Sequence, residues 1–152
     1  MKIAIAADHA GYQLKQELFK ELKALGHEAL DLGTRDPSQP SDYPDFAQAV
    51  GSALLAHEAE RGVIVCGSGV GVCIAANKIP GVRAGVCHDT YSARQGVEHD
   101  DMNVLCIGQR VVGVELAKEL LRAFVAARFS VKEPRHVARL EKLKAIENRY
   151  LR

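Results

Sequence analysis

Residues 63–76, VIVCGSGVGVCIAA, constrain the fold of this chain more than any other stretch. The first three residues are apolar and β-branched, and the run is too short for a helix, so it is typical of a buried strand. A glycine-rich turn at 66–71 follows, after which apolar residues recur as in a helix with one buried side. Such a turn forms an anion site, because free backbone N–H groups and the positive helix end point into one concavity. Cys66 at the strand tip and Ser68 in the turn add a thiol and a hydroxyl to this site.

The composition is that of a single cytoplasmic domain. The chain has 152 residues, and its 47% hydrophobic content is enough to fill one core. Its 20 basic and 19 acidic side chains leave a net charge of +1, which argues against binding to nucleic acid or to an anionic membrane. No apolar run approaches the roughly 20 residues of a membrane span, and the first residues lack a signal-peptide pattern. We therefore expect one domain over residues 1–152, carrying an anion site that is local.

Strand-like and helix-like segments alternate along the whole chain. Strands are expected at 2–7, 27–32, 63–65, 82–87 and 103–107. Helices are expected at 14–25, 42–54, 70–77, 88–97, 111–125 and 134–150. Residues 98–102 are interpreted as the connection into the last strand. This alternation predicts an α/β fold, a Rossmann-like doubly wound domain whose five-stranded parallel sheet is covered by helices on both faces.

The last expected helix is more highly charged than packing requires. Arg135 and Arg139 are four residues apart and therefore share one face near its N-terminus. This face could simply be solvated. A terminal helix that follows a complete five-stranded unit could instead pack on a second subunit, and both interpretations stay open on spacing alone.

The four cysteines form no C-x-x-C pair of the zinc or redox kind. Cys73, Cys87 and Cys106 lie in apolar patterns and are expected to be buried and inert. Cys66 differs because it stands where a strand ends and an anion-binding turn begins.

Asp8 and His9 follow the first expected strand. Ligands of open parallel sheets bind beyond the carboxyl ends of the strands, which makes both residues candidates for a site. The alternative for Asp8 is to cap the helix that follows.

The motif spacing separates several chemistries. A serine-hydrolase elbow, G-x-S-x-G, is excluded because Cys66 and Val70 occupy its outer positions. A dinucleotide motif would be G-x-G-x-x-G after the first strand, yet Asp89 stands near the place of a ribose-binding acid and keeps nucleotide binding open. The six histidines are scattered without a zinc signature, so no metal is expected. What remains is proton transfer beside a carbonyl, or a non-catalytic module that binds a sugar phosphate or a nucleotide.

Seven ordered motifs resemble those of the B-type ribose-5-phosphate isomerases, in the wider family that includes the galactose-6-phosphate isomerase subunits. The motifs lie at residues 7–11, 42–44, 66–71, 75–78, 91–94, 103–105 and 110–113. The resemblance implies an aldose–ketose isomerase that uses neither cofactor nor metal. It also implies homodimers, in some members tetramers, whose active sites are shared between two chains. Ribose 5-phosphate is the expected substrate, with six-carbon phosphates of allose or galactose as the alternative.

The same resemblance assigns roles within the glycine turn. Cys66 corresponds to the general base that moves a proton between C1 and C2 through an enediolate. Ser68 corresponds to a residue that takes part in ring opening or in proton transfer between the sugar oxygens. The enediolate oxygen would be held by the main chain of Gly67, Gly69, Val70 and Gly71.

Further roles implied by the resemblance lie outside the turn. Asp8 and His99 correspond to the residues that open the furanose ring, and Asp100 stands where the family usually has Asn beside the substrate. The expected phosphate ligands are His9, Arg110, Arg135 and Arg139. Two of the residues outside the turn, His99 and Arg110, are expected to come from the neighbouring subunit.

Overall fold

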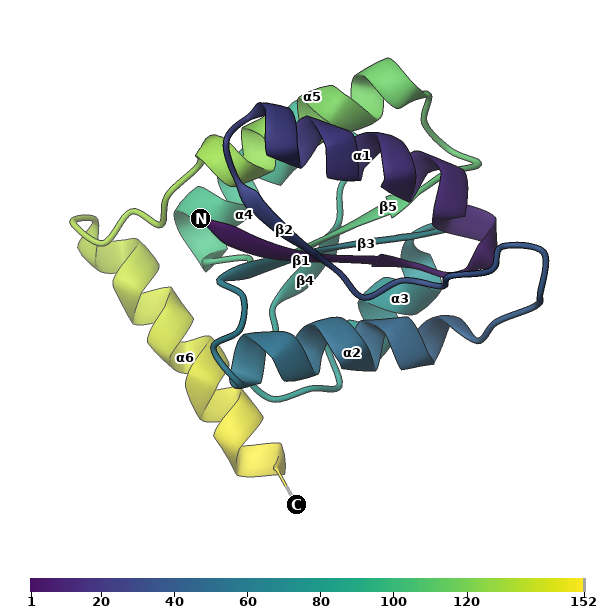
Figure 1. Cartoon of the computed structure of the whole chain (residues 1–152). Helices are drawn as coiled ribbons and strands as arrows, with labels where there is room; N and C mark the ends of the chain where they lie inside the picture. The colour runs from purple at the N-terminus through teal and green to yellow at the C-terminus, as the bar shows by residue number, and fades with distance from the viewer. Residues whose placement is uncertain (152) are drawn as a thin grey trace.

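The computed structural model describes residues 1–151 and contains a five-stranded parallel sheet in the order β2-β1-β3-β5-β4 (Figure 1). The strands are β1 (Lys2–Ala7), β2 (Glu28–Asp31), β3 (Arg61–Cys66), β4 (Ala84–Val86) and β5 (Val104–Gly108). The α-helices are α1 (Tyr12–Ala24), α2 (Tyr43–Leu55), α3 (Val70–Ala76), α4 (Thr90–Asp100), α5 (Val114–Ala126) and α6 (Pro134–Tyr150), and a short 3-10 helix, η1 (His9–Gly11), precedes α1. Within the described residues, no helix combines the length and the apolar character needed to cross a membrane. The α/β fold predicted from the alternation is confirmed.

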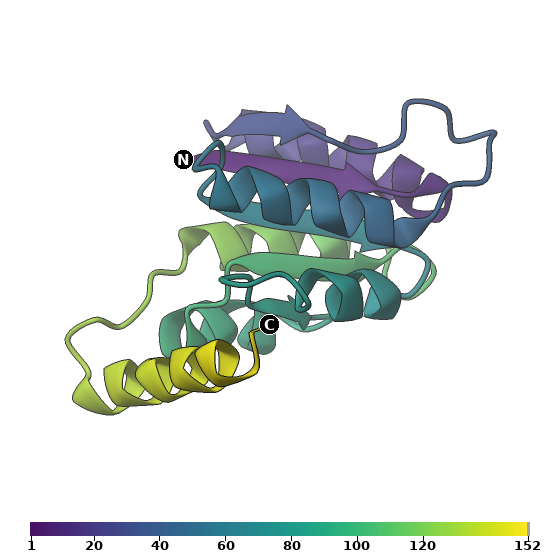
Figure 2. The same cartoon turned by 90° about the horizontal axis from the view of Figure 1, so that it is seen from below.

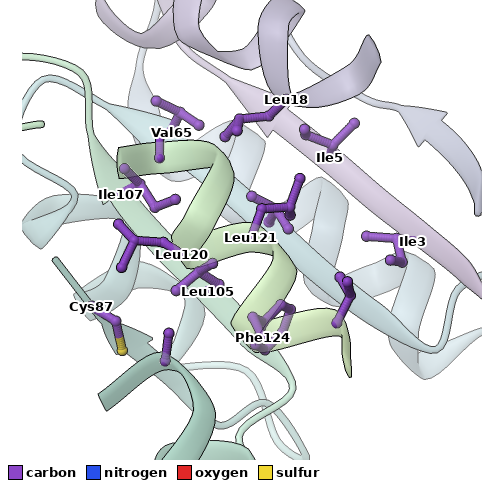
Figure 3. Packing of buried hydrophobic residues seen from close by; sticks show 14 of the residues in the cluster. Ile3, Ile5, Leu18, Val65, Cys87, Leu105, Ile107, Leu120, Leu121 and Phe124 are labelled. Carbon is purple, nitrogen blue, oxygen red and sulfur yellow. The ribbon is translucent and has the colours of Figure 1, made fainter. Parts of the chain in front are cut away.

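Helices cover both faces of the sheet because side chains alternate between the faces along each strand. Ile3 and Ile5 of β1 point to one face, where they pack with Leu18 of α1 and with α4 and α5 (Figure 3). Ala4 and Ala6 point to the opposite face and pack in a second apolar cluster with α2 and α3. The chain leaves β1 toward β2 on one side and reaches β3 on the other. The order of the strands therefore reverses between β1 and β3, and ligands of open α/β sheets bind beyond the carboxyl ends of the strands at such a point.

The end of α4 differs from the prediction. The apolar pattern indicated a helix ending at Val97, but the helix continues to Asp100 and so includes Glu98 and His99. It ends at Asp101, which adopts a left-handed conformation with φ of 52° and donates its N–H to the carbonyl of Val97. The extra turn is polar because it emerges from the core, and hydrophobic periodicity cannot detect such a turn.

The C-terminal helix α6 runs beyond the β4 edge of the sheet instead of covering one of its faces (Figure 2). The N-terminal part of α6 contacts α4, where the ring of His136 stacks on that of His99. Farther along, a carboxylate oxygen of Glu147 accepts the N–H of Gly81 at 2.9 Å. Several large apolar side chains of α6 remain exposed, among them Leu143 and Ile146. An amphipathic helix with an uncovered apolar side has unused capacity for packing.

Candidate active site

A cavity of about 450 Å³ opens at the carboxyl ends of β1 and β3. It is lined by Asp8, His9, Ala10, Tyr43, Cys66, Gly67, Ser68, Gly71, Arg110 and Val111. The topology brings these segments together, because the carboxyl ends of adjacent parallel strands lie at one edge of the sheet. Many of the residues singled out in the sequence thus share one cavity, and Tyr43 joins them as a lining residue to which no role was assigned.

Cys66 is the last residue of β3 and places its sulfur at the cavity wall. The residue is only 5% exposed, and the N–H of Gly69 donates to its Sγ at 3.0 Å. Gly69 adopts φ of 81°, the left-handed region that favours glycine, and this conformation turns its N–H back toward the end of the strand. A main-chain donor at the sulfur stabilises negative charge there.

The glycine turn rests directly on the end of β5. A methyl group on Gly69 would lie 3.1 Å from the nitrogen of Gly108, and one on Gly108 would lie 2.6 Å from the carbonyl oxygen of Ser68. Two backbones therefore touch with no side chain between them. The hydroxyl of Ser68 is exposed and accepts the N–H of Val70 at 3.2 Å.

Asp8 both caps a helix and lines the cavity, so the two interpretations of this residue are compatible. Its carboxylate is buried and accepts the N–H of Gly11 at 3.1 Å at the start of η1. His9 is exposed, and its Nδ1 accepts the N–H of Ser41 at 3.2 Å. An acceptor role for Nδ1 leaves the ring proton on Nε2, where it can be donated to a ligand. No sequence motif singled out Ser41, so this contact was not predicted.

Arg110 lines the same cavity as Cys66 of its own chain, in contrast to the expectation that it would come from a neighbouring subunit. The reason is the register of the sheet, which pairs Cys66 with Gly108. The turn after Gly108 then crosses the end of β3, and the N–H of Arg110 donates to the carbonyl of Gly67 at 3.0 Å. The guanidinium group lies over the glycine turn, with its Nη1 3.4 Å from the position of a methyl group on Gly67.

A second group of expected site residues lies away from this cavity. His99 and Asp100 are in the last turn of α4, while Arg135 and Arg139 are exposed on the first turns of α6. Because α4 starts after β4 and leads back into the beginning of β5, its last turn lies at the amino ends of the strands. One chain therefore carries the expected residues as two separate groups, one at the carboxyl ends of the strands and the other at their amino ends.

The second group includes a histidine for which no role was predicted from the sequence. His136 is 4% exposed, its ring centroid is 4.0 Å from that of His99, and its Nδ1 has no hydrogen-bond partner among residues 1–151. Burial, followed by the nearby His99 and Arg135, lowers the pKa of His136 below its usual range. The Nδ1 of His99 contacts the side-chain nitrogen of Gln95 at 2.9 Å. These contacts orient His99 through residues that no sequence motif marked.

The expectation of three inert cysteines is correct for Cys87 and Cys106 in their burial but not for Cys73. Cys73 is only partly buried on α3, where a hydrogen bond from the thiol of Cys106 lowers its pKa to about 7. Burial raises the pKa of Cys87 to about 11. No group of three or more metal-ligating side chains occurs among residues 1–151.

These values predict which thiol an alkylating reagent modifies. The rate of iodoacetamide modification at Cys73 is expected to rise through neutral pH and to level off above it, since only the thiolate reacts. Peptide mass spectrometry over a pH series measures this rate, with Cys87 of the same sample as an internal reference that stays unmodified. A rate at Cys73 that rises only near the pH of an ordinary thiol would contradict the assignment.

Comparison with known proteins identifies the family. Residues 3–143 match the family model described as Ribose/Galactose Isomerase. The chain is 45% identical to the ribose-5-phosphate isomerase B of Escherichia coli, over 97% of both proteins. It is 40% identical to the D-erythrulose-4-phosphate isomerase 2 of Mycolicibacterium smegmatis, over 85% of this chain and 86% of that protein.

The fold agrees with this result. The structure of ribose-5-phosphate isomerase B from Clostridium thermocellum superimposes with a TM-score of 0.95 at 44% identity, covering 99% of this chain and all of that one. Sequence and fold thus match over nearly the full length. The chain belongs to the ribose/galactose isomerase family.

Proposed function

We propose that this chain interconverts ribose 5-phosphate and ribulose 5-phosphate as a homodimer, without a metal or an organic cofactor. Family membership supports the coarser statement that the chain is a sugar-phosphate isomerase. The observation that carries the finer proposal is the sulfur of Cys66 at the wall of a cavity, 3.0 Å from the N–H of Gly69. A thiol held beside a main-chain donor is suited to act as a base.

In the proposed mechanism the sugar ring opens first. Of Asp8 and His99, one takes the proton of the C1 hydroxyl and the other gives a proton to the ring oxygen as the bond between that oxygen and C1 breaks. The Cys66 thiolate then removes the proton from C2 of the open aldose, and the electrons move into an enediolate. The thiol returns the proton to C1, which gives the ketose. Ser68 transfers a proton between the two neighbouring oxygens.

The turn also supplies the donors for the enediolate oxygen. The N–H of Gly69 is used on Cys66 Sγ, and the N–H of Val70 is used on the hydroxyl of Ser68. The oxygen is therefore assigned to the N–H groups of Gly67 and Gly71. Loss of one such donor typically costs about 3 to 4 kcal/mol of transition-state stabilisation.

The site is completed by a second copy of the chain. The cavity contains His9 and Arg110 for the phosphate, while Arg135 and Arg139 lie toward the opposite ends of the strands. A two-fold axis that brings α6 of each chain over the cavity of the other would unite the two groups, because a symmetric dimer uses the same patch on both subunits. The exposed apolar residues of α6 supply such a contact surface. Each copy, one domain over residues 1–152, then contributes half of each site, and pairs of dimers could assemble further into tetramers.

The proposal is tested by assaying the purified chain in the presence of a chelator. Ribose 5-phosphate should be converted to ribulose 5-phosphate, and in deuterated water the hydrogen at C2 should exchange, as proton transfer through an enediolate requires. Binding of the sugar phosphate with no exchange would mark a non-catalytic module instead. Because one relative is named for D-erythrulose 4-phosphate, four-carbon phosphates belong in the panel together with five- and six-carbon ones. A preference for one of the others would replace the proposed substrate.

A further inference from the structure

The imidazole of His88 makes a hydrogen bond to β5 just beyond the point where β4 stops. The last register pair of β4 and β5 joins Val86 to Cys106, and β5 continues for two more residues to Gly108. The N–H of Gly108 faces the side of the sheet on which β4 has already ended. His88 Nε2 accepts this N–H at 3.0 Å. A side chain therefore makes the bond that a longer β4 would have made with its backbone.

Gly108 is also the residue against which the glycine turn, residues 66–71, packs. Its nitrogen is 3.1 Å from the position of a methyl group on Gly69, and its own methyl position is 2.6 Å from the carbonyl oxygen of Ser68. Backbone packed on backbone leaves no flexible side chain to absorb a displacement. The next link is the N–H of Gly69, which donates to Cys66 Sγ at 3.0 Å.

We infer that His88 is a positioning residue for the isomerase reaction, holding Gly108 so that Gly69 keeps its N–H on the sulfur of Cys66. The inference rests on the proposed role of Cys66. His88 does not line the cavity and is not a catalytic residue. It acts through two backbone segments, and its effect should therefore appear in the reactivity of Cys66 and in kcat.

The chemistry of the bond restricts what can replace His88. A backbone N–H can only donate, so Nε2 carries no proton and the ring proton is on Nδ1. Glutamine places its carbonyl oxygen near the position of Nε2 and keeps the acceptor. Leucine fills a comparable volume without an acceptor, and asparagine is too short to reach. His88→Gln and His88→Leu therefore differ mainly in the acceptor itself.

The test compares these variants in a Cys73→Ser background, so that iodoacetamide at neutral pH reports on Cys66. We expect His88→Leu to lower the alkylation rate of Cys66 and kcat by roughly tenfold each, with KM changed by less than about threefold. His88→Gln should remain within about threefold of the parent protein in all three quantities. Far-UV circular dichroism checks folding, and His88→Asn serves in place of His88→Leu if the latter does not fold.

Two results would overturn the inference. One is His88→Leu with parental alkylation rate and kcat, and the other is His88→Gln as impaired as His88→Leu, which would indicate a need for the ring's shape instead of its acceptor. Failure of the proposed function looks different. Full activity in Cys66→Ala would remove Cys66 as the base, while the alkylation rates would still show whether His88 acts on the sulfur.

Discussion

Replacement of Cys66 by alanine is expected to lower kcat by about 10²- to 10⁴-fold, the range that general bases contribute. The sulfur is the group at the tip of β3 that lines the cavity and receives the N–H of Gly69. Alanine removes the proton acceptor and leaves His9 and Arg110 in place for the phosphate. Affinity for a phosphorylated sugar acid that mimics the enediolate should therefore stay within about threefold of that of the parent protein, as calorimetry would measure.

Cys73→Ala is the matched control, because Cys73 lies outside the cavity lining and should be dispensable for turnover. The Cys66 variant also has a predictable cost in stability. The buried N–H of Gly69 loses its acceptor, which should lower the free energy of unfolding by about 1 to 3 kcal/mol. A folded Cys66→Ala protein with near-parental kcat would show that another group moves the proton, and the assignment of the base would have to be abandoned.

The fold was predictable because local patterns and tertiary packing agree in this chain. β1 and α6 occupy the predicted residues 2–7 and 134–150, since β1 is a short apolar run that ends before a polar residue, Asp8, and α6 begins at Pro134. The cavity followed from a topological rule, that the carboxyl ends of adjacent parallel strands meet. Asp8 and Cys66 could thus be placed together from residues far apart in the sequence.

What could not be predicted depends on contacts between distant segments. A lysine of an amphipathic helix is expected on the polar side, but the ammonium group of Lys15 on α1 is buried and pairs with Asp31 of β2 at 2.6 Å. The stacking of His136 on His99 likewise needs the packing of α6 on α4, which no periodicity encodes. The ladder position of His88 depends on where β4 stops, and β4 begins two residues later than predicted and ends one residue earlier.

The division of the expected residues into two groups gives a second prediction with a large effect. A Cys66→Ala chain and an Arg135→Ala/Arg139→Ala chain should each be nearly inactive alone at low substrate concentration, yet active when combined in one dimer. In the mixed dimer, one site joins the intact Cys66 half of one chain to the intact arginine half of the other. Its second site carries both defects. Random pairing of equal amounts gives half mixed dimers with one good site each, or about a quarter of the parental activity.

The matched control combines two defects that lie in the same cavity. Asp8→Asn and Cys66→Ala both damage the cavity at the carboxyl ends of the strands. Every site of their mixed dimer therefore keeps one defect, and no activity should return. Co-expression with two different affinity tags isolates the mixed dimers, and both arginines are exposed, so their removal should leave the fold intact. If the first mixture is no more active than the sum of its parts, each cavity works with residues of one chain alone, and α6 must serve some purpose other than delivering its arginines to a neighbour.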